Sequence, residues 1–171
     1  MKREYLEGGK ILSSHGVRGA VKAEHFCDSA RVLAMQKRIF FRVKDELVER
    51  RVLSASVSGN FVIMTLEGVS DRECAIALRG TIFYLHRDDI PLKKGDMLIA
   101  DIIGLPVFHA ESGEPLGEIC DVSDTAGRRI YTVKYEGREV LVPGVSEFIK
   151  EISESGVRIL PIPGLFFDDE V

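Results

Sequence analysis

The chain has 171 residues, of which 45% are hydrophobic and 29% charged, with 16 Gly, 6 Pro and no Trp, a composition typical of folded proteins. No stretch approaches the roughly 20 consecutive apolar residues that span a bilayer, and Glu4 and Glu7 interrupt a signal-peptide core, so we predict a cytoplasmic protein and exclude a membrane-spanning or secreted one. Residues 1–90 carry 15 Lys and Arg against 12 Asp and Glu, whereas residues 91–171 carry 8 against 15, which favours a polyanion as partner of the first half and a basic protein as partner of the second.

The first half consists mainly of short β-rich runs. Six strands are predicted, over residues 5–12, 20–26, 38–43, 47–57, 61–66 and 81–86. Two short helices are predicted over 30–36 and 71–78, the second with Ser70 as its N-cap and Gly80 as its end. The first two strands read as a hairpin with a long loop over 13–19. Six strands suit a small closed barrel better than an open sheet.

A polar segment that contains a Pro and a Gly separates the two halves, and we place a domain boundary there. The first domain is expected to span residues 1–92 and the second residues 93–171. Five strands are predicted in the second domain, over residues 105–109, 116–122, 130–135, 138–142 and 157–162. Short strands at this spacing indicate a barrel or a sandwich. The predicted fold class is therefore all-β, with two small domains.

The chain lacks the common signatures of cofactor and metal sites. It contains no G-x-G-x-x-G and no G-x-x-x-x-G-K-[ST] motif, and two β domains lack the strand–helix alternation of nucleotide-binding enzymes. The four histidines lack the close spacing with Cys or acid that zinc sites show, so we predict no metal and no cofactor. The cysteines form no obvious pair and are predicted to be small core residues: Cys27, Cys74 and Cys120.

The most distinctive motif lies between residues 8 and 22. Gly16 and Gly19 allow positive φ angles and the close approach of another molecule. Basic side chains around them offer hydrogen-bond donors to phosphate or ribose oxygens: Lys10, His15, Arg18 and Lys22. Such a loop can clamp an RNA backbone. The alternative is a hairpin loop whose glycines satisfy only the turn and whose Arg18 is solvated.

Three further features allow more than one interpretation. The stretch Ser13-Ser14-His15 could suggest a nucleophile and a base, but adjacent strand residues face opposite sides and no G-x-S-x-G elbow surrounds them. The apolar segment 161–167 either closes its own domain or packs on a partner. The pair Arg128-Arg129 is a basic spot in an acidic domain, and it is either a contact site or a solvated turn.

Taken together, these motifs resemble the ribosome maturation factor family RimM. Residues 15–22, HGVRGAVK, look like the family's HG-[ILV]-[RK]-G signature, and residues 75–80 are similar to its A-x-x-L-[RK]-G helix end. Residues 101–105, DIIGL, are similar to its D-L-[IV]-G-L entry into the second domain. Shorter matches follow in the family's order at 116–119, 140–143 and 163–165. The resemblance therefore covers nearly the whole chain.

The resemblance implies a six-stranded barrel like those of translation factors, followed by a PRC-barrel domain. It also implies a non-catalytic assembly factor of the small ribosomal subunit. Such a factor binds a basic protein of the subunit head, the nineteenth of the small-subunit series, and assists folding and processing of the 3′ domain of the rRNA. The residues expected to contact rRNA of the immature subunit are His15, Gly16, Arg18, Gly19 and Lys22. We expect the protein to be a monomer.

The second domain departs from the family pattern at two places. Where the family usually has an aromatic cluster, this chain reads Met97-Leu98-Ile99-Ala100, which keeps only apolar contact. The family's usual Asn-Asp in a later loop is here Arg128-Arg129, which adds positive charge where a basic partner would lie. The residues expected to contact the ribosomal protein are Met97, Leu98, Asp101, Arg128, Arg129 and Pro143.

Two other functions stay open on the sequence alone. An RNA-modifying or hydrolytic enzyme would use His15 with a carboxylate, although a second catalytic motif is missing. A PRC-barrel scaffold unrelated to ribosomes would have the same fold, but a pull-down with it would recover no ribosomal material. Binding to immature small subunits distinguishes both alternatives from an assembly factor.

Overall fold

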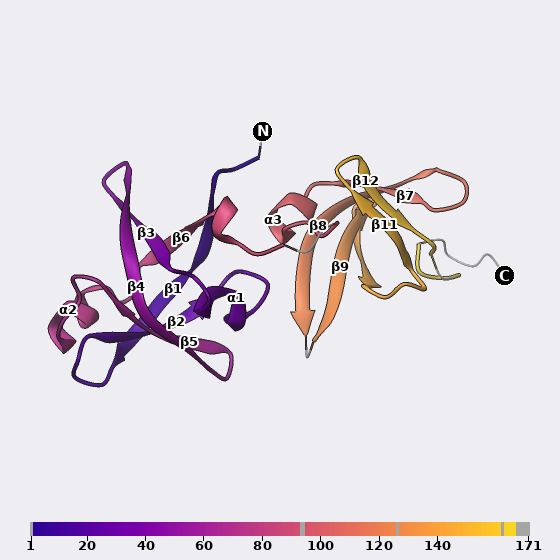
Figure 1. Cartoon of the computed structure of the whole chain (residues 1–171). Helices are drawn as coiled ribbons and strands as arrows, with labels where there is room; N and C mark the ends of the chain where they lie inside the picture. Colours follow the sequence, from indigo (N-terminus) through magenta and orange to yellow (C-terminus); the bar gives the residue numbers. More distant parts are fainter. Residues whose placement is uncertain (1, 93–94, 126, 162, 167–171) are drawn as a thin grey trace. The chain divides into compact units, whose positions relative to one another are not determined.

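The computed structural model describes residues 2–92, 95–125, 127–161 and 163–166. The chain divides into two compact units, Met1–Lys93 and Lys94–Val171, and each contains its own β-sheet (Figure 1). The division falls one residue after the predicted end of the first domain, although Lys93 itself lies outside the described residues.

The first unit is a closed barrel of six antiparallel strands. The strands are β1 (Tyr5–His15), β2 (Ala20–His25), β3 (Arg38–Val43), β4 (Glu46–Ser58), β5 (Phe61–Leu66) and β6 (Ile82–His86). They pair in the order β1-β2-β5-β4-β3-β6, and β1 also pairs with β6 to close the ring. Alternation along each strand directs apolar residues inward, for example Val62, Met64 and Leu66 of β5, which are all buried. The predicted six-stranded barrel is confirmed.

Two short helices connect strands of the barrel, α1 (Ala30–Ala34) between β2 and β3 and α2 (Arg72–Ala77) between β5 and β6, and a 3-10 turn, η1 (Arg87–Asp89), follows β6. The hydroxyl of Ser29 caps α1 by accepting a hydrogen bond from the Val32 N–H at 3.3 Å. The cap of α2 is Asp71 and not the predicted Ser70, because the Asp71 carboxylate accepts a hydrogen bond from the Cys74 N–H at 2.8 Å. No helix among the described residues has the length and apolarity that crossing a membrane requires.

Two further local predictions are wrong. The loop between β1 and β2 is shorter than predicted, because Ser13 and Ser14 pair with Lys22 and Val21 across the hairpin. Only residues 16–19 remain as the turn. The cysteines are not all core residues, since Cys27 is half-buried and packs against the core of the first unit, Cys120 is half-buried and Cys74 is exposed. Burial raises the pKa of the Cys27 thiol to about 11, which keeps that thiol protonated and unreactive near neutral pH.

The second unit is a six-stranded sheet with one short helix. Its elements are α3 (Ile99–Ile102), β7 (Pro106–His109), β8 (Pro115–Thr125), β9 (Arg128–Tyr135), β10 (Arg138–Pro143), β11 (Ile149–Ser153) and β12 (Gly156–Ile159). The strands lie in the order β10-β9-β8-β7-β12-β11, with a parallel pair between β7 and β12 and antiparallel pairs elsewhere. Within the described residues, β10 and β11 are the end strands. The sequence predicted five of these strands and missed β11.

The apolar segment after residue 160 closes the second unit. Phe166 is fully buried among the core residues, and its ring packs edge-on against Tyr135 with 5.6 Å between the ring centroids. The Arg138 guanidinium donates a hydrogen bond of 2.6 Å to the Phe166 carbonyl oxygen. Of the two open interpretations of this segment, the described part therefore supports closure of its own domain; residues 162 and 167 lie outside the described residues.

Candidate functional site

The rRNA-contact residues predicted from the sequence lie together at one hairpin of the first unit. His15 is the last residue of β1 and pairs with Ala20, the first residue of β2. The four residues between them form the turn, and Lys22 follows two positions after Ala20 on β2. The tight cross-strand pairing of β1 with β2 thus places the whole predicted set at one end of the barrel.

The two glycines of this turn have different structural roles. Both adopt positive φ angles, +70° at Gly16 and +82° at Gly19, which L side chains rarely tolerate. A Cβ at Gly16 would meet nothing within 4 Å, whereas a Cβ at Gly19 would lie 2.4 Å from the Val69 carbonyl oxygen. Gly19 therefore holds the turn against the segment that leads into α2, and Gly16 leaves the outer side of the turn open.

The side chains at the tip project into solvent. His15 and Arg18 are exposed, and neither side chain forms a hydrogen bond or an ion pair with the described residues. Val17 between them is 73% exposed, which is a large value for an aliphatic residue. Lys22 is half-buried, and its Nζ lies 4.2 Å from the centroid of the Phe61 ring, a cation–π contact that orients the ammonium group along the outer barrel wall.

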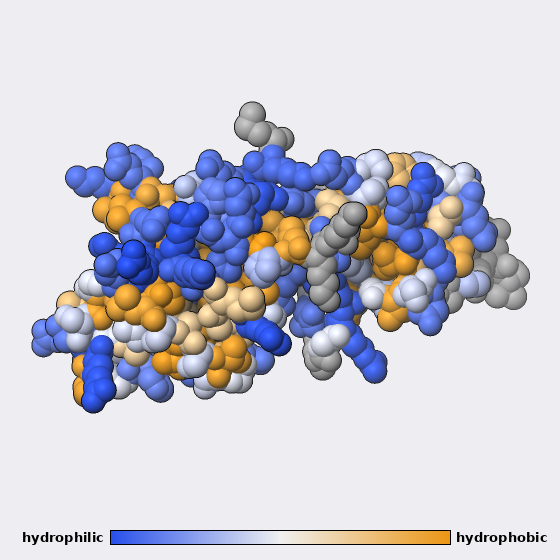
Figure 2. All heavy atoms as spheres, viewed as in Figure 1, coloured by the Kyte–Doolittle hydropathy of each residue, from blue (hydrophilic) through white to orange (hydrophobic). Residues whose placement is uncertain are grey.

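Sequence reasoning missed Val17 and Phe61 as parts of this site. Exposed apolar residues in isolation are ordinary, and the sequence alone cannot show that Val17 stands at the tip of a glycine-flanked turn. Figure 2 shows separate hydrophobic patches among hydrophilic residues on the face in view. A tip that combines one apolar and two donor-bearing side chains can contact both the phosphates and the bases of an RNA strand.

The arrangement does not resemble a catalytic centre. Ser13, Ser14 and His15 are consecutive strand residues, so their side chains alternate between the two faces of β1. The described part of the chain places no carboxylate in a hydrogen bond or ion pair with His15. It also contains no group of three or more His, Cys, Asp or Glu residues that could hold a metal ion.

The predicted protein-contact residues fall into two groups, and the first lies at α3. Met97 is half-buried and packs against the core of the second unit. Leu98 precedes α3 as its N-cap residue and is only 4% exposed. Leu98 therefore presents almost no surface to a partner in this structure. Asp101 is half-buried in the first turn of α3.

The second group lies where the first residues of β9 run beside the last residues of β10. Arg128 is exposed, Arg129 is half-buried, and the two side chains point to opposite faces of the sheet because they are adjacent on β9. Pro143 is exposed and pairs with Ile130. The Gly144 N–H donates a hydrogen bond of 2.7 Å to the Arg129 carbonyl oxygen, which brings Pro143 and the two arginines to the same end of the sheet.

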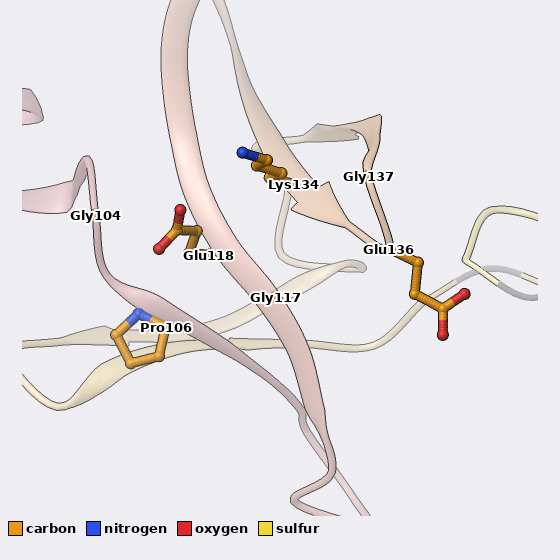
Figure 3. A pocket seen from close by; sticks show the side chains of 7 residues that line it. All are labelled: Gly104, Pro106, Gly117, Glu118, Lys134, Glu136 and Gly137. Carbon is orange, nitrogen blue, oxygen red and sulfur yellow. The ribbon is translucent and has the colours of Figure 1, made fainter.

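A hollow of about 420 Å³ lies on the second unit and was not predicted. Its lining residues come from the segment after α3, from β7, β8 and β9, and from the β9–β10 turn: Gly104, Pro106, Gly117, Glu118, Lys134, Glu136 and Gly137. Figure 3 shows Glu118 and Lys134 on the same side of neighbouring strands, whereas Glu136 points away. The glycines leave backbone exposed between charged side chains, which suits contact with another polar surface rather than enclosure of a small apolar ligand.

Comparison with protein families decides the classification of the chain. The RimM N-terminal domain matches residues 6–90, and the RimM PRC barrel domain matches residues 99–163. The chain belongs to the RimM family of ribosome maturation factors. This result confirms the resemblance carried by the sequence motifs, and with it the PRC-barrel class of the second unit.

Individual RimM proteins are similar to this chain over almost its full length. Ribosome maturation factor RimM from Acetivibrio thermocellus is 31% identical over 173 residues, which cover 98% of this chain and 99% of that protein. Its counterpart from Symbiobacterium thermophilum is 36% identical over 165 residues, or 94% of this chain and 93% of that protein. The crystal structure of a 16S ribosomal RNA processing protein RimM from Pseudomonas aeruginosa covers 92% of this chain and 98% of its own, with 25% identity and a TM-score of 0.48.

Proposed function

We propose that the protein assists maturation of the small ribosomal subunit in the cytoplasm by binding alone, with no bond chemistry of its own. The first unit contacts rRNA of the immature subunit, and the second unit binds the basic head protein that is nineteenth in the small-subunit series. By holding protein and rRNA in a competent arrangement, the factor favours folding and processing of the 3′ domain. Membership of the RimM family supports the ribosomal role.

The single observation that carries the rRNA contact is the geometry of the β1–β2 turn. Arg18 and His15 project from a turn that Gly19 fixes against the start of α2. The Arg18 guanidinium has no hydrogen bond or ion pair with the described residues and is available for phosphate, and a preorganised turn loses little conformational entropy on binding. The net charge of +3 over residues 1–90 favours approach to a polyanion.

The second unit supports the protein contact through its charge. Residues 91–171 carry a net charge of −7, with 8 Lys and Arg against 15 Asp and Glu. An acidic surface attracts a basic ribosomal protein and disfavours rRNA, so the two units are suited to different components of the same particle. Met97, Asp101, Arg128, Arg129 and Pro143 remain proposed contacts, while Leu98 is buried.

The test is co-sedimentation of the purified protein with immature and mature small subunits at low and moderate salt. We expect a preference for immature subunits, and we expect Arg18→Glu to weaken binding about tenfold at low salt and to flatten its salt dependence, because each phosphate contact releases counterions. Arg50→Glu is the matched control, since Arg50 is an exposed arginine on β4. Equal binding of both particles, or of Arg18→Glu and the unaltered protein, would contradict the proposal.

A further inference from the structure

The strand register of the second unit arranges one sheet face in rows. Lys134 of β9 pairs with Glu118 of β8 and with Glu139 of β10. Two residues earlier on β9, Thr132 pairs with Asp121 and Leu141 in the same way. Side chains that are paired across strands lie on the same face, so these residues share the face opposite the core residues Tyr131 and Val133. We name this surface the outer face of β8–β9–β10.

The outer face contains an apolar centre. Leu141 is 59% exposed on β10, and Pro143, two residues further along the same strand, is also exposed. Pro143 pairs with the half-buried Ile130. Three apolar side chains therefore lie close together on this sheet face. Exposure of the Leu141 side chain to solvent on an end strand is unfavourable.

Acidic residues border this apolar centre. Glu118, Asp121 and Glu139 are all exposed, and none of them forms an ion pair or a hydrogen bond through its carboxylate within the described part of the chain. Lys134 pairs across strands with two of them, and the exposed Arg128 lies on the same face of β9 beyond Ile130. The face therefore carries three carboxylates against two basic side chains. Glu118 and Lys134 also line the hollow in Figure 3, so the face continues into that hollow.

The free edge of β10 is poorly suited to the addition of another strand. The Gly144 N–H donates to the Arg129 carbonyl oxygen. Antiparallel geometry therefore directs the N–H groups of residues 138, 140 and 142 toward β9, whereas the backbone groups of residues 139, 141 and 143 face the open edge. Residue 143 is a proline and has no N–H. A partner consequently finds its contacts on the outer face more readily than along the edge.

We propose that the outer face of β8–β9–β10 docks a basic protein segment, which places an aliphatic or aromatic side chain on Leu141 and Pro143 and Lys or Arg side chains on Glu118, Asp121 and Glu139. The proposal rests on the proposed function and deepens it by locating the protein contact. The three carboxylates outnumber the basic side chains of Lys134 and Arg128, so the face favours a basic protein segment over phosphate. A second copy of the same face would bring the same carboxylates together at an unfavourable distance.

The test measures binding of the full-length protein to the purified nineteenth small-subunit protein, with co-sedimentation on immature subunits as a second readout. The variants are Leu141→Asp and the double change Glu118→Lys with Glu139→Lys. Leu53→Asp is the matched apolar control, because Leu53 is also 59% exposed but lies on β4 of the first unit. Glu111→Lys, in the exposed turn between β7 and β8, controls for charge reversal. Thermal unfolding verifies that each variant is folded.

The expected result is a loss of affinity of at least tenfold for the ribosomal protein in both outer-face variants, with little change in either control. The charge-reversal variant should also lose most of its salt dependence. If the unaltered protein binds the ribosomal protein and the outer-face variants bind it equally well, the docking surface is wrong and the proposed function stands. If the unaltered protein binds neither the ribosomal protein nor the immature subunit, the proposed function fails and this proposal fails with it. Self-association that Leu141→Asp abolishes would assign the face to a second copy and would also overturn the proposal.

Discussion

In the first unit β1 pairs with both β2 and β6, so the sheet closes on itself, whereas in the second unit the described strands run from β10 at one end to β11 at the other. A closed sheet has no free edge, and its accessible backbone is confined to turns such as residues 16–19. The second sheet differs in having two end strands among the described residues, β10 and β11. For the same number of strands, the proposed contact site is therefore a hairpin tip in one unit and the outer face of β8–β9–β10 in the other.

The charges of the two units follow this division. Exposed Arg18 stands at the tip of the first unit, while exposed Glu118, Asp121 and Glu139 border Leu141 on the second. A single guanidinium group on a tight turn suits a phosphate, and a flat face with an apolar centre and an acidic border suits a protein. These differences in sheet topology and surface charge support the proposal that the first unit contacts rRNA and the second a protein.

The largest expected effect comes from the two cores. Phe83 in the first unit and Phe166 in the second are each fully buried in separate hydrophobic clusters. Phe83→Ala and Phe166→Ala should each lower the free energy of unfolding of their own unit by about 3–5 kcal/mol, because each leaves a cavity. Hydrogen exchange resolved by residue measures the two units separately. Equal loss of protection in both units from either single change would show that the units do not unfold independently.

An intermediate effect distinguishes the two glycines of the β1–β2 turn. Gly16→Ala places a side chain at φ +70° in open space, and Gly19→Ala places one at φ +82° against the Val69 carbonyl oxygen. We expect Gly16→Ala to cost about 1–2 kcal/mol of stability and Gly19→Ala about 2–4 kcal/mol, since only the second adds a steric clash to the backbone strain. Chemical denaturation measures both. Equal costs would mean that the turn is not anchored at Gly19.

The smallest effect concerns the cap of α2, against which the turn is held. The hydrogen bond from the Cys74 N–H holds the pKa of Asp71 below its ordinary range. The stabilisation is therefore fully present above the ordinary Asp pKa of about 4 and is lost as the pH falls through the lower folded-state value. Thermal unfolding between about pH 7 and pH 3 should show this loss in the unaltered protein and not in Asp71→Asn, which keeps an acceptor oxygen but does not titrate. An unchanged pH profile in Asp71→Asn would contradict this role.

Much of the fold could be predicted from the sequence, because the strands of the barrel contain β-branched and aromatic residues between clear turn signals. Segment 61–66 is an example, since its alternation survives unchanged as the inward and outward faces of β5. The missed strand β11 has the sequence Ile-Lys-Glu-Ile-Ser, in which a Lys-Glu pair interrupts the apolar period. Its pairing with β12 stabilises it as a strand, and such pairing between strands overrides weak local propensity.

The candidate contact residues, too, could be predicted only where they depend on local sequence and not on pairing between strands. The residues of the β1–β2 turn could be selected from their glycines and basic side chains, since those residue types and their spacing are local properties. The rows Glu118–Lys134–Glu139 and Asp121–Thr132–Leu141 could not, because they depend on the register between three strands, and a shift by one residue would move each side chain to the opposite face.

The sequence by itself determined the class of the protein: two β units, the family signature around residues 15–22, and opposite net charges in the two halves. These properties follow from local composition and from the order of motifs along the chain. The tertiary structure alone decided that Leu98 is buried, that Gly19 anchors the turn, and that Leu141 stands exposed among acids. The physical reason is that burial, close approach and cross-strand neighbourhood are relations between residues distant in the chain, which form only when the sheets assemble.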